Sequence, residues 1–379
     1  MRIFRFPRRK TWAVFAALVA LIIIASLQCR RNERSPIQEE PETQSTSLTS
    51  GHPFYDYEAF FELDEPRQPR EMVEPNLEFL NCSEPAPYGE KLSLGLLVLP
   101  DLIMEETVDI FPEISPGGNW KPVNCSARQK VAIIIPYRDR SEHLVLILTY
   151  LIPLLKHQQL DFRFIVSEQI GDDLFNKGRI MNAGFTFAEK FGVDCVIFHD
   201  VDMIPENLDI PYRCPQRGFA GHLGAYVNKF GYNLLYDGLV GGVLAFNVAD
   251  FVHVNGYSSE YWTWGGEDDD MAIRIIIQRM DILRPRKEDR YTMIKHLSRY
   301  SSSKGNRKLI RKLLNNTVTN MVEDGLNNPK WKIKKVELKP LFYHLFVDVG
   351  DPPTQWKAKP KNNTDPQISS TTSTTLKSS

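Results

Sequence analysis

The sequence predicts a mostly parallel, twisted α/β sheet with helices on both faces. Its apolar runs are short and rich in β-branched residues, and they begin at Val131, Phe162, Cys195, Gly241 and Leu341. Segments with the spacing of amphipathic helices separate the first of these runs. Continuous apolar strands that alternate with helices are typical of parallel sheets buried on both sides. Ligands of such sheets bind beyond the carboxyl ends of the strands, so the residues after each run are candidate site residues.

Length and composition indicate a globular protein. The chain has 379 residues, of which 42% are apolar and 25% are charged. These values suit one large domain or two ordinary ones, and we expect a single folded domain over residues 81–351. The formal net charge of −1 gives no indication of nucleic acid or of an acidic polymer as a partner.

The N-terminal residues have the pattern of a membrane anchor. Residues 12–28 contain no charged side chain and follow a basic stretch within residues 1–11. We expect a cytoplasmic tail over 1–11 and a transmembrane signal-anchor over 12–28, which makes a single-pass type II protein with a lumenal body. A cleaved signal peptide is the alternative. The short span favours the Golgi membrane, because thinner bilayers accommodate shorter segments.

Two segments are predicted to lack a fold of their own. Residues 29–80 are rich in Pro, Glu, Gln, Ser and Thr, which indicates a flexible stem. Residues 352–379 change from Pro, Lys and Asn to Ser and Thr, which indicates a disordered tail. Neither composition buries enough apolar surface to offset the conformational entropy lost on folding.

The cysteines favour an oxidising compartment. Apart from Cys29 there are four, Cys82, Cys125, Cys195 and Cys214, which predict two disulfides in one of three connectivities. Their spacing does not match a zinc site. Four sequons permit N-glycosylation in a lumenal protein, at Asn81, Asn124, Asn315 and Asn362.

Charged side chains follow two of the predicted strands. Arg138 and Arg140 come after the first apolar run, in PYRDR. Guanidiniums there suit a diphosphate through bidentate hydrogen bonds, with two solvated surface arginines as the alternative. Asp200 and Asp202 follow the run that begins at Cys195, and residues two apart in an extended chain face the same way. Two carboxylates at this position suit Mn²⁺ or Mg²⁺.

The segment MIKH ends a further strand-like stretch and offers His296 as another metal ligand. Imidazole binds Mn²⁺, although a lone histidine is more often structural. Softness argues against Met293 as a ligand, because thioethers prefer soft metals.

The segment YWTWGGEDDD, Tyr261–Asp270, combines two tryptophans, a glycine pair and four carboxylates. Repulsion among the carboxylates makes such a run costly unless a ligand, metal or cation offsets it. Aromatic faces beside carboxylates can hold a sugar, and one carboxylate could deprotonate an attacking hydroxyl. The alternative is an acidic first turn of a helix, which the helix dipole stabilises.

Taken in order, PYRDR, FNKGRIMNAGF, HDVDM, VNKFGY, WGGEDDD and MIKH resemble the β-1,4-galactosyltransferase family of Golgi enzymes, glycosyltransferase family 7. Within it the sequence is most similar to invertebrate β-1,4-N-acetylgalactosaminyltransferases. The resemblance extends from PYRDR to FVDVG, which is most of the predicted domain. It implies a GT-A nucleotide-sugar-binding fold, a UDP-sugar donor, Mn²⁺, and inversion at the anomeric carbon to form a β1-4 bond to N-acetylglucosamine.

The resemblance also implies catalytic roles. Asp268 matches the general base that takes the proton of the acceptor's 4-hydroxyl, and Glu267 and Asp269 match residues that position the sugars. The donor–acceptor cleft corresponds to Phe230, Tyr236, Leu239, Trp264, Gly266, Asp268 and Asp269.

The metal and donor sites are implied in the same way. The metal ligands correspond to Asp202, Met293 and His296, so the resemblance supports the methionine that softness disfavours. The donor site corresponds to Pro136, Tyr137, Arg138, Arg140, Phe175, Lys177, Val201, Asp202, Lys229 and Trp264. The family pairs cysteines that match Cys82 with Cys125 and Cys195 with Cys214. Its loop that closes after donor binding matches residues 297–317.

Two departures from the family pattern concern the donor. Lys177 stands where the family has arginine, and Arg179 is a candidate to compensate for it. Leu239 stands where galactose-transferring members have a tyrosine that crowds the C2 substituent of the donor sugar. Leucine leaves room for an N-acetyl group, so we expect GalNAc transfer from UDP-GalNAc to a terminal GlcNAc on a glycolipid or glycoprotein.

Two other functions are alternatives. In a galactosyltransferase that uses UDP-Gal, Leu239 would be a tolerated substitution. In an inactive lumenal lectin with the same fold, we would expect Asp202, Asp268 or His296 to have been lost, and all three are present.

Overall fold

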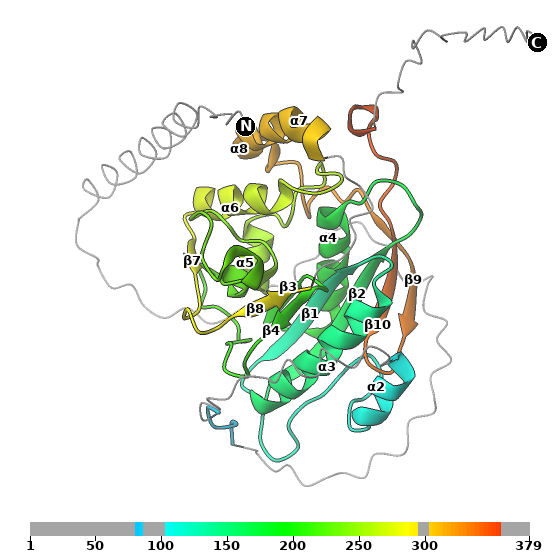
Figure 1. Cartoon of the computed structure of the whole chain (residues 1–379), viewed down its shortest axis with the longest axis vertical. Helices are drawn as coiled ribbons and strands as arrows, with labels where there is room; N and C mark the ends of the chain where they lie inside the picture. The colour runs from blue at the N-terminus through cyan, green and yellow to red at the C-terminus, as the bar shows by residue number, and fades with distance from the viewer. Residues whose placement is uncertain (1–79, 86–102, 295–302, 358–379) are drawn as a thin grey trace, which may run out of the picture. The chain divides into compact units, whose positions relative to one another are not determined.

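The computed structural model describes residues 80–85, 103–294 and 303–357, which belong to one compact unit, Pro75–Ser379. The centre of this part is an eight-stranded sheet in the order β7-β5-β6-β3-β1-β2-β10-β9 (Figure 1). Strands β3, β1, β2 and β10 are parallel neighbours, whereas β6 and β9 pair antiparallel to them. The sheet is therefore mixed with a parallel centre, as the alternation of strands and helices predicted.

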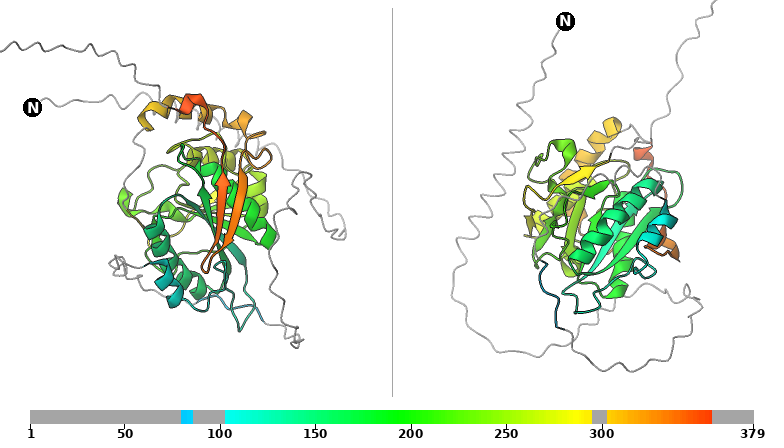
Figure 2. Two further views of the ribbon diagram at one scale, coloured as in Figure 1. Left: turned by 90° about the vertical axis from the view of Figure 1, so that its right-hand side faces the viewer. Right: turned by 60° about the horizontal axis from the view of Figure 1, so that its bottom comes forward.

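The strands are short, and their bounds are as follows. The large sheet contains β1 (Lys130–Tyr137), β2 (Asp161–Gln169), β3 (Cys195–His199), β5 (Phe219–His222), β6 (Val243–Asn247), β7 (Asp281–Leu283), β9 (Lys332–Leu338) and β10 (Tyr343–Asp348). A separate two-stranded sheet pairs β4 (Met203–Pro205) with β8 (Tyr291–Met293). Figure 2 (left) shows β9 and β10 in orange at one edge of the large sheet.

Helices cover both faces of the sheet. Helix α3 packs with α2 on one face, and α4, α5 and α6 contribute to the core on the other (Figure 1). The helices are α2 (Met104–Ile110), α3 (Ser141–His157), α4 (Lys177–Ala188), α5 (Val248–His253), α6 (Glu267–Ile277), α7 (Ser303–Asn315) and α8 (Thr317–Asn320). Short 3₁₀ turns are η3 (Glu189–Phe191), η4 (Leu223–Ala225), η5 (Asn228–Phe230) and η6 (Thr354–Trp356).

Strand β1 shows why its sequence is apolar after Lys130. Val131, Ile133 and Ile135 pack into the core on the α3 face. Ala132 and Ile134 pack into the core on the α4 face, and all five side chains are fully buried. A strand with helices on both sides has no solvent-facing positions, so the polar alternation of a surface strand is absent.

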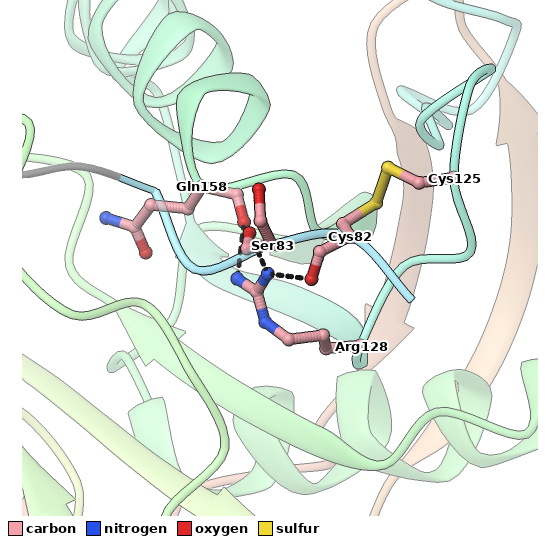
Figure 3. Close-up of a disulfide and its surroundings, with 5 residues drawn as sticks. All are labelled: Cys82, Ser83, Cys125, Arg128 and Gln158. Carbon is pink, nitrogen blue, oxygen red and sulfur yellow. Dashed lines mark hydrogen bonds between the residues drawn. A yellow bond between two sulfur atoms is a disulfide. The ribbon is translucent and has the colours of Figure 1, made fainter. Parts of the chain in front are cut away.

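Both implied disulfides are present. Cys82 pairs with Cys125 and Cys195 with Cys214. The first disulfide joins residues 80–85 to the domain, and Figure 3 shows Arg128 beside it. The Arg128 guanidinium donates to the carbonyl of Cys82 at 2.7 Å, and also to the carbonyl of Ser83.

We expect a Cys82→Ser/Cys125→Ser double variant to lose about 3–4 kcal/mol of unfolding free energy, because this disulfide closes a long loop in the unfolded chain. Denaturant titration of the variant and the wild type measures the difference. An unchanged denaturation midpoint would show that Arg128 alone secures the segment.

The fold continues past residue 351, the predicted end of the domain. Trp356 in η6 is 2% exposed and belongs to the core on the α4 face. Within the described ranges, no helix is long and apolar enough to cross a membrane. The predicted anchor at 12–28, the stem up to residue 79 and the sequon at Asn362 lie outside those ranges.

Candidate active site

Helix α6 begins directly after the glycine pair of WGGEDDD. Gly265 and Gly266 have left-handed backbone conformations, with φ of 100° and 101°, which favour glycine. A Cβ on Gly266 would lie 2.7 Å from Tyr261 Cε1 and 2.8 Å from Ile310 Cγ2, so α7 packs closely over the start of α6. The four carboxylates occupy the first turn, where the helix dipole favours negative charge. The alternative interpretation of this run, an acidic first turn of a helix, is therefore confirmed.

The four carboxylates of this turn have different environments. Asp270 is 2% exposed and forms an ion pair with Arg274 at 3.2 Å. Asp269 accepts a hydrogen bond from the Tyr236 hydroxyl at 2.7 Å. The first two carboxylates of the turn face the N-terminus of α4. A helical turn must distribute consecutive side chains around the axis, which is why Asp270 points to the buried Arg274 while Asp269 faces the exposed Tyr236.

The ammonium of Lys177, the first residue of α4, lies among three carboxylates. Its Nζ is 2.8 Å from Asp200 Oδ1, 3.7 Å from Glu267 Oε1 and 3.8 Å from Asp268 Oδ1. Burial disfavours the charge of Lys177, but these carboxylates outweigh burial and raise its pKa well above the usual value. A cation from a second helix thus offsets the repulsion within the acidic run.

Asp268 combines an elevated pKa with access from outside. Burial raises the pKa of Asp268 to about 7, against the opposing effect of Lys177, and the neighbouring carboxylates add to the rise. Its side chain keeps 30% exposure. A Cβ on Gly241 would lie 2.4 Å from Asp268 Oδ2, so the carboxylate lies against the turn that carries Leu239. A reachable carboxylate with a pKa near neutrality is suited to accept a proton.

We expect the Asp268→Asn variant to melt at a higher temperature than the wild type at pH 8. The folded-state pKa of about 7 exceeds the ordinary value of 3.8, so ionising this carboxylate costs free energy in the folded state. That cost develops as pH rises from the unfolded pKa to the folded pKa, so the gain should be smaller at pH 5. Thermal denaturation at both pH values measures it, and a pH-independent difference would contradict the assignment.

Two of the three expected metal ligands are neighbours. Asp202 precedes β4 and Met293 ends β8, and these strands pair through Met203 and Met293. The backbone N–H of Ile294 donates to the carbonyl of Asp202 at 2.9 Å. His296 lies outside the described ranges, within which no three His, Cys, Asp or Glu side chains could hold a metal. Asp202 offers the hard oxygen that Mn²⁺ prefers, whereas the Met293 thioether is a soft ligand that only the family resemblance supports.

Arg138 directly follows β1, and its guanidinium lies over the ring of Phe175. The guanidinium carbon is 4.8 Å from the ring centre. The carbonyl of Phe175 accepts from the N–H of Thr263 at 2.8 Å, which ties this pair to the loop before α6. The ring of Tyr137 instead packs into the core on the α3 face. The other donor-site candidates lie near the same strand ends: Pro136 in β1, Arg140 before α3, and Val201 between β3 and β4.

Arg179 does not compensate at the donor site, and that expectation is wrong. Its side chain is buried, and its Nε donates to the carbonyl of Ser259 at 2.9 Å. The guanidinium carbon lies 4.7 Å from the Trp262 ring centre. Arg179 lies in the first turn of α4, two residues after Lys177, and side chains two residues apart in a helix point to nearly opposite sides.

Exposed aromatic rings lie near the start of α6. Trp264 is 74% exposed and Tyr236 is 40% exposed, so both can present a face to a ligand. Turn η5 is tied to β8 because Asn228 Oδ1 accepts from the N–H of Met293 at 2.9 Å. The cleft candidate Phe230 and the donor-site candidate Lys229 both lie in η5, where the Lys229 ammonium is 5.6 Å from the Phe230 ring centre.

Sequence reasoning missed a buried hydrogen-bonded chain between β3 and β8. His199 Nε2 lies 2.7 Å from the Tyr212 hydroxyl, to which the Tyr291 hydroxyl donates at 3.0 Å. Burial lowers the pKa of His199 to about 4, so the ring is neutral near pH 7. The available signal was a histidine at the end of the apolar run CVIFH, where a polar group needs a partner.

Comparison with known proteins gives matches over most of the described domain. A family model described as the N-terminal region of glycosyl transferase group 7 matches residues 85–215. A second model, described as the N-terminal domain of galactosyltransferase, matches residues 221–297.

Individual relatives agree with these models. Human beta-1,4-galactosyltransferase 4 is 40% identical over 276 residues, which cover 72% of this chain and 78% of the relative. Beta-1,4-galactosyltransferase 3 of Cricetulus griseus is 37% identical over 279 residues, covering 72% and 68%.

A solved structure of Drosophila beta-1,4-galactosyltransferase 7, a point mutant in complex with manganese, UDP-Gal and xylobiose, is 28% identical. It superimposes with a TM-score of 0.51 over 59% of this chain and 95% of the other. A complex of the same enzyme's catalytic domain with xylobiose gives a TM-score of 0.50 at 27% identity. These similarities support the GT-A-like α/β fold that the sequence resemblance implied.

Proposed function

The chain belongs to glycosyl transferase group 7, and on this premise we propose that it transfers a sugar from a UDP-sugar to the 4-hydroxyl of a terminal N-acetylglucosamine, with inversion and with Mn²⁺. The observation that carries the proposal is the reachable Asp268 carboxylate, with its pKa near 7, beside Lys177 and the Leu239 turn. An enzyme of this type needs a base for the acceptor hydroxyl next to the donor sugar.

The relatives support galactose as the transferred sugar. The human and hamster proteins are named beta-1,4-galactosyltransferases, and the fly enzyme was solved in complex with UDP-Gal. UDP-GalNAc, the donor expected first from the sequence, has no support from these relatives. The alternative considered beside it, a galactosyltransferase, agrees better with them.

UDP-GalNAc is the second candidate donor, and Leu239 favours it. The side chain is half-buried, and its turn lies against Asp268 at Gly241. The difference between the two donors is an N-acetyl group at C2, so the size and polarity of one neighbouring side chain can decide between them.

The proposed reaction uses the charges around Asp268. The acceptor's 4-hydroxyl attacks the anomeric carbon from the face opposite the leaving group, while its proton passes to the Asp268 carboxylate. The bond from the anomeric carbon to the diphosphate oxygen breaks, and its electron pair leaves with UDP. Asp269, held by the Tyr236 hydroxyl at 2.7 Å, is placed to accept from an acceptor hydroxyl. Arg138 at the end of β1 offers a cation to the diphosphate.

Asp202 and Met293 would hold the metal, together with His296 from outside the described ranges. A bound Mn²⁺ supplies Lewis-acid stabilisation of the negative charge on the departing diphosphate. We propose further that the enzyme acts in the Golgi lumen from an anchor at residues 12–28, on glycolipid or glycoprotein acceptors.

Turnover of UDP-Gal and UDP-GalNAc by the full chain, measured in parallel with Mn²⁺ and a GlcNAc acceptor, tests the proposal. We expect transfer from at least one donor, and the faster donor assigns the specificity. Absence of transfer from both, by a folded protein that still binds GlcNAc, would favour the inactive lectin.

A further inference from the structure

Asp324, which follows α8, is a buried carboxylate without a part in the proposed reaction. The residue is 7% exposed. One of its oxygens accepts from Arg274 Nη2 at 3.3 Å and from the Ser258 hydroxyl, and the other accepts from the N–H of Ser259 at 2.8 Å. Charge-assisted hydrogen bonds to three groups fix this carboxylate in one position.

The first group connects Asp324 to helix α6. Arg274 is fully buried and also pairs with Asp270 at 3.2 Å. Its Nη1 donates to the carbonyl of Gly256 at 3.2 Å. Asp270 is two residues from Asp268 on the same helix, so these contacts set the rotation of α6 about its axis and the direction of the Asp268 carboxylate.

The Ser259 peptide connects Asp324 to helix α4. While the Ser259 N–H donates to Asp324, its carbonyl accepts from Asn176 Nδ2 at 2.9 Å. Asn176 caps α4, because its Oδ1 accepts from the N–H of Arg179 at 3.0 Å. Lys177 is the next residue, so the position of its ammonium depends on this cap.

The two helices have little freedom to shift at this junction. A Cβ on Gly178 would lie 2.2 Å from the carbonyl oxygen of Ser258, so α4 touches the 258–259 backbone directly. We propose that Asp324 is a positioning residue, which holds α4 and α6 so that Lys177 stays beside Asp268. The proposal rests on the function assigned above, since it concerns the base of that reaction.

The Asp324→Asn variant tests this role, because it keeps the shape of the side chain and removes the charge. We expect kcat to fall by about 10- to 100-fold, as for a small displacement of a reacting group, while the donor KM stays within about twofold. The acid limb of kcat/KM should move to higher pH, because a more distant Lys177 opposes the burial of Asp268 less. The charged and titratable groups near Asp268 are Lys177, Asp200, Glu267, Asp269, Tyr236 and Tyr257.

Asp250→Asn is the matched control. The Asp250 side chain is 4% exposed and pairs with Arg217 at 2.9 Å, and no hydrogen bond among the described residues joins it to Asp324 or Lys177. We expect this control to lose stability and to keep the wild-type pH profile. If Asp324→Asn fails to fold, Asn176→Ser breaks only the α4 connection, because a serine hydroxyl still caps the helix.

A double-mutant cycle separates this inference from the proposed function, since it requires no turnover. In the Asp324→Asn background, or in Asn176→Ser, we expect the gain in melting temperature at pH 8 from Asp268→Asn to be larger than in the wild type. Additive melting shifts would overturn the positioning role, and so would an unchanged pH profile of kcat/KM in an active Asp324→Asn variant. If the wild type transfers no sugar, the proposed function is rejected. The double-mutant cycle then tests the positioning role of Asp324 by itself.

Discussion

Replacing Asp268 with asparagine is expected to lower kcat by about 10²- to 10⁴-fold, the contribution of a general base. The substitution keeps the size of the side chain but removes the group that takes the acceptor proton. Affinity for UDP and Mn²⁺ should change little, because Arg138 and the metal-ligand candidates Asp202 and Met293 lie on other elements of the fold. Steady-state turnover gives kcat, and calorimetric titration with UDP and Mn²⁺ gives the donor affinity.

Asp268→Asn is also expected to be more stable than the wild type at pH 8. Loss of activity together with a gain in stability would identify Asp268 as a catalytic residue. A residue with a purely structural role would lose activity and stability together, whereas a strained catalytic group loses activity and gains stability. Asp250→Asn serves again as a buried carboxylate outside the site. Retention of kcat within about tenfold in Asp268→Asn would assign the base to another residue.

Replacing Leu239 with tyrosine is expected to lower the kcat/KM ratio of UDP-GalNAc to UDP-Gal by about 10- to 200-fold, the range for a change of one pocket side chain. The larger ring would occupy space in the turn that lies against Asp268, where the C2 substituent of the donor is expected. The direction of the change does not depend on which donor the wild type prefers. Initial rates with both donors measure it.

Leu239→Ile is the matched control for the donor site. It conserves the volume and apolar character of the side chain, so the donor ratio should remain near that of the wild type. A ratio in Leu239→Tyr that lies within about twofold of wild type would show that this position does not face the C2 substituent.

The strands were predictable because they depend on local spacing, whereas the roles of the site candidates came from the family resemblance. Strand β1 is recognisable from a continuous apolar run, and Asp202 from its place just after β3. Glu267, Asp268 and Asp269 follow a glycine pair and begin a helix. This arrangement can be recognised from the sequence pattern alone. The disulfide pairing needed the resemblance, since four cysteines allow three connectivities.

The partners of these residues were not predictable, because they depend on how distant elements pack. Lys177 joins the acids of α6 from another helix, and nothing in its sequence neighbourhood distinguishes that contact from one to a diphosphate. Asp270 belongs to the same acidic run as Asp268 but pairs inside the core with Arg274. The contacts of Asp324 likewise join segments far apart in the chain.

The most direct test of the account is the structure of the reaction product. The full chain is incubated with Mn²⁺, UDP-Gal or UDP-GalNAc, and a GlcNAc acceptor, and the isolated disaccharide is analysed by NMR. We expect a β-configured sugar on the 4-oxygen of GlcNAc, formed by the wild type and lost in Asp268→Asn. An α-configured product, linkage to another hydroxyl, or equal product from the variant would contradict the assignment of Asp268 as the base of an inverting transfer.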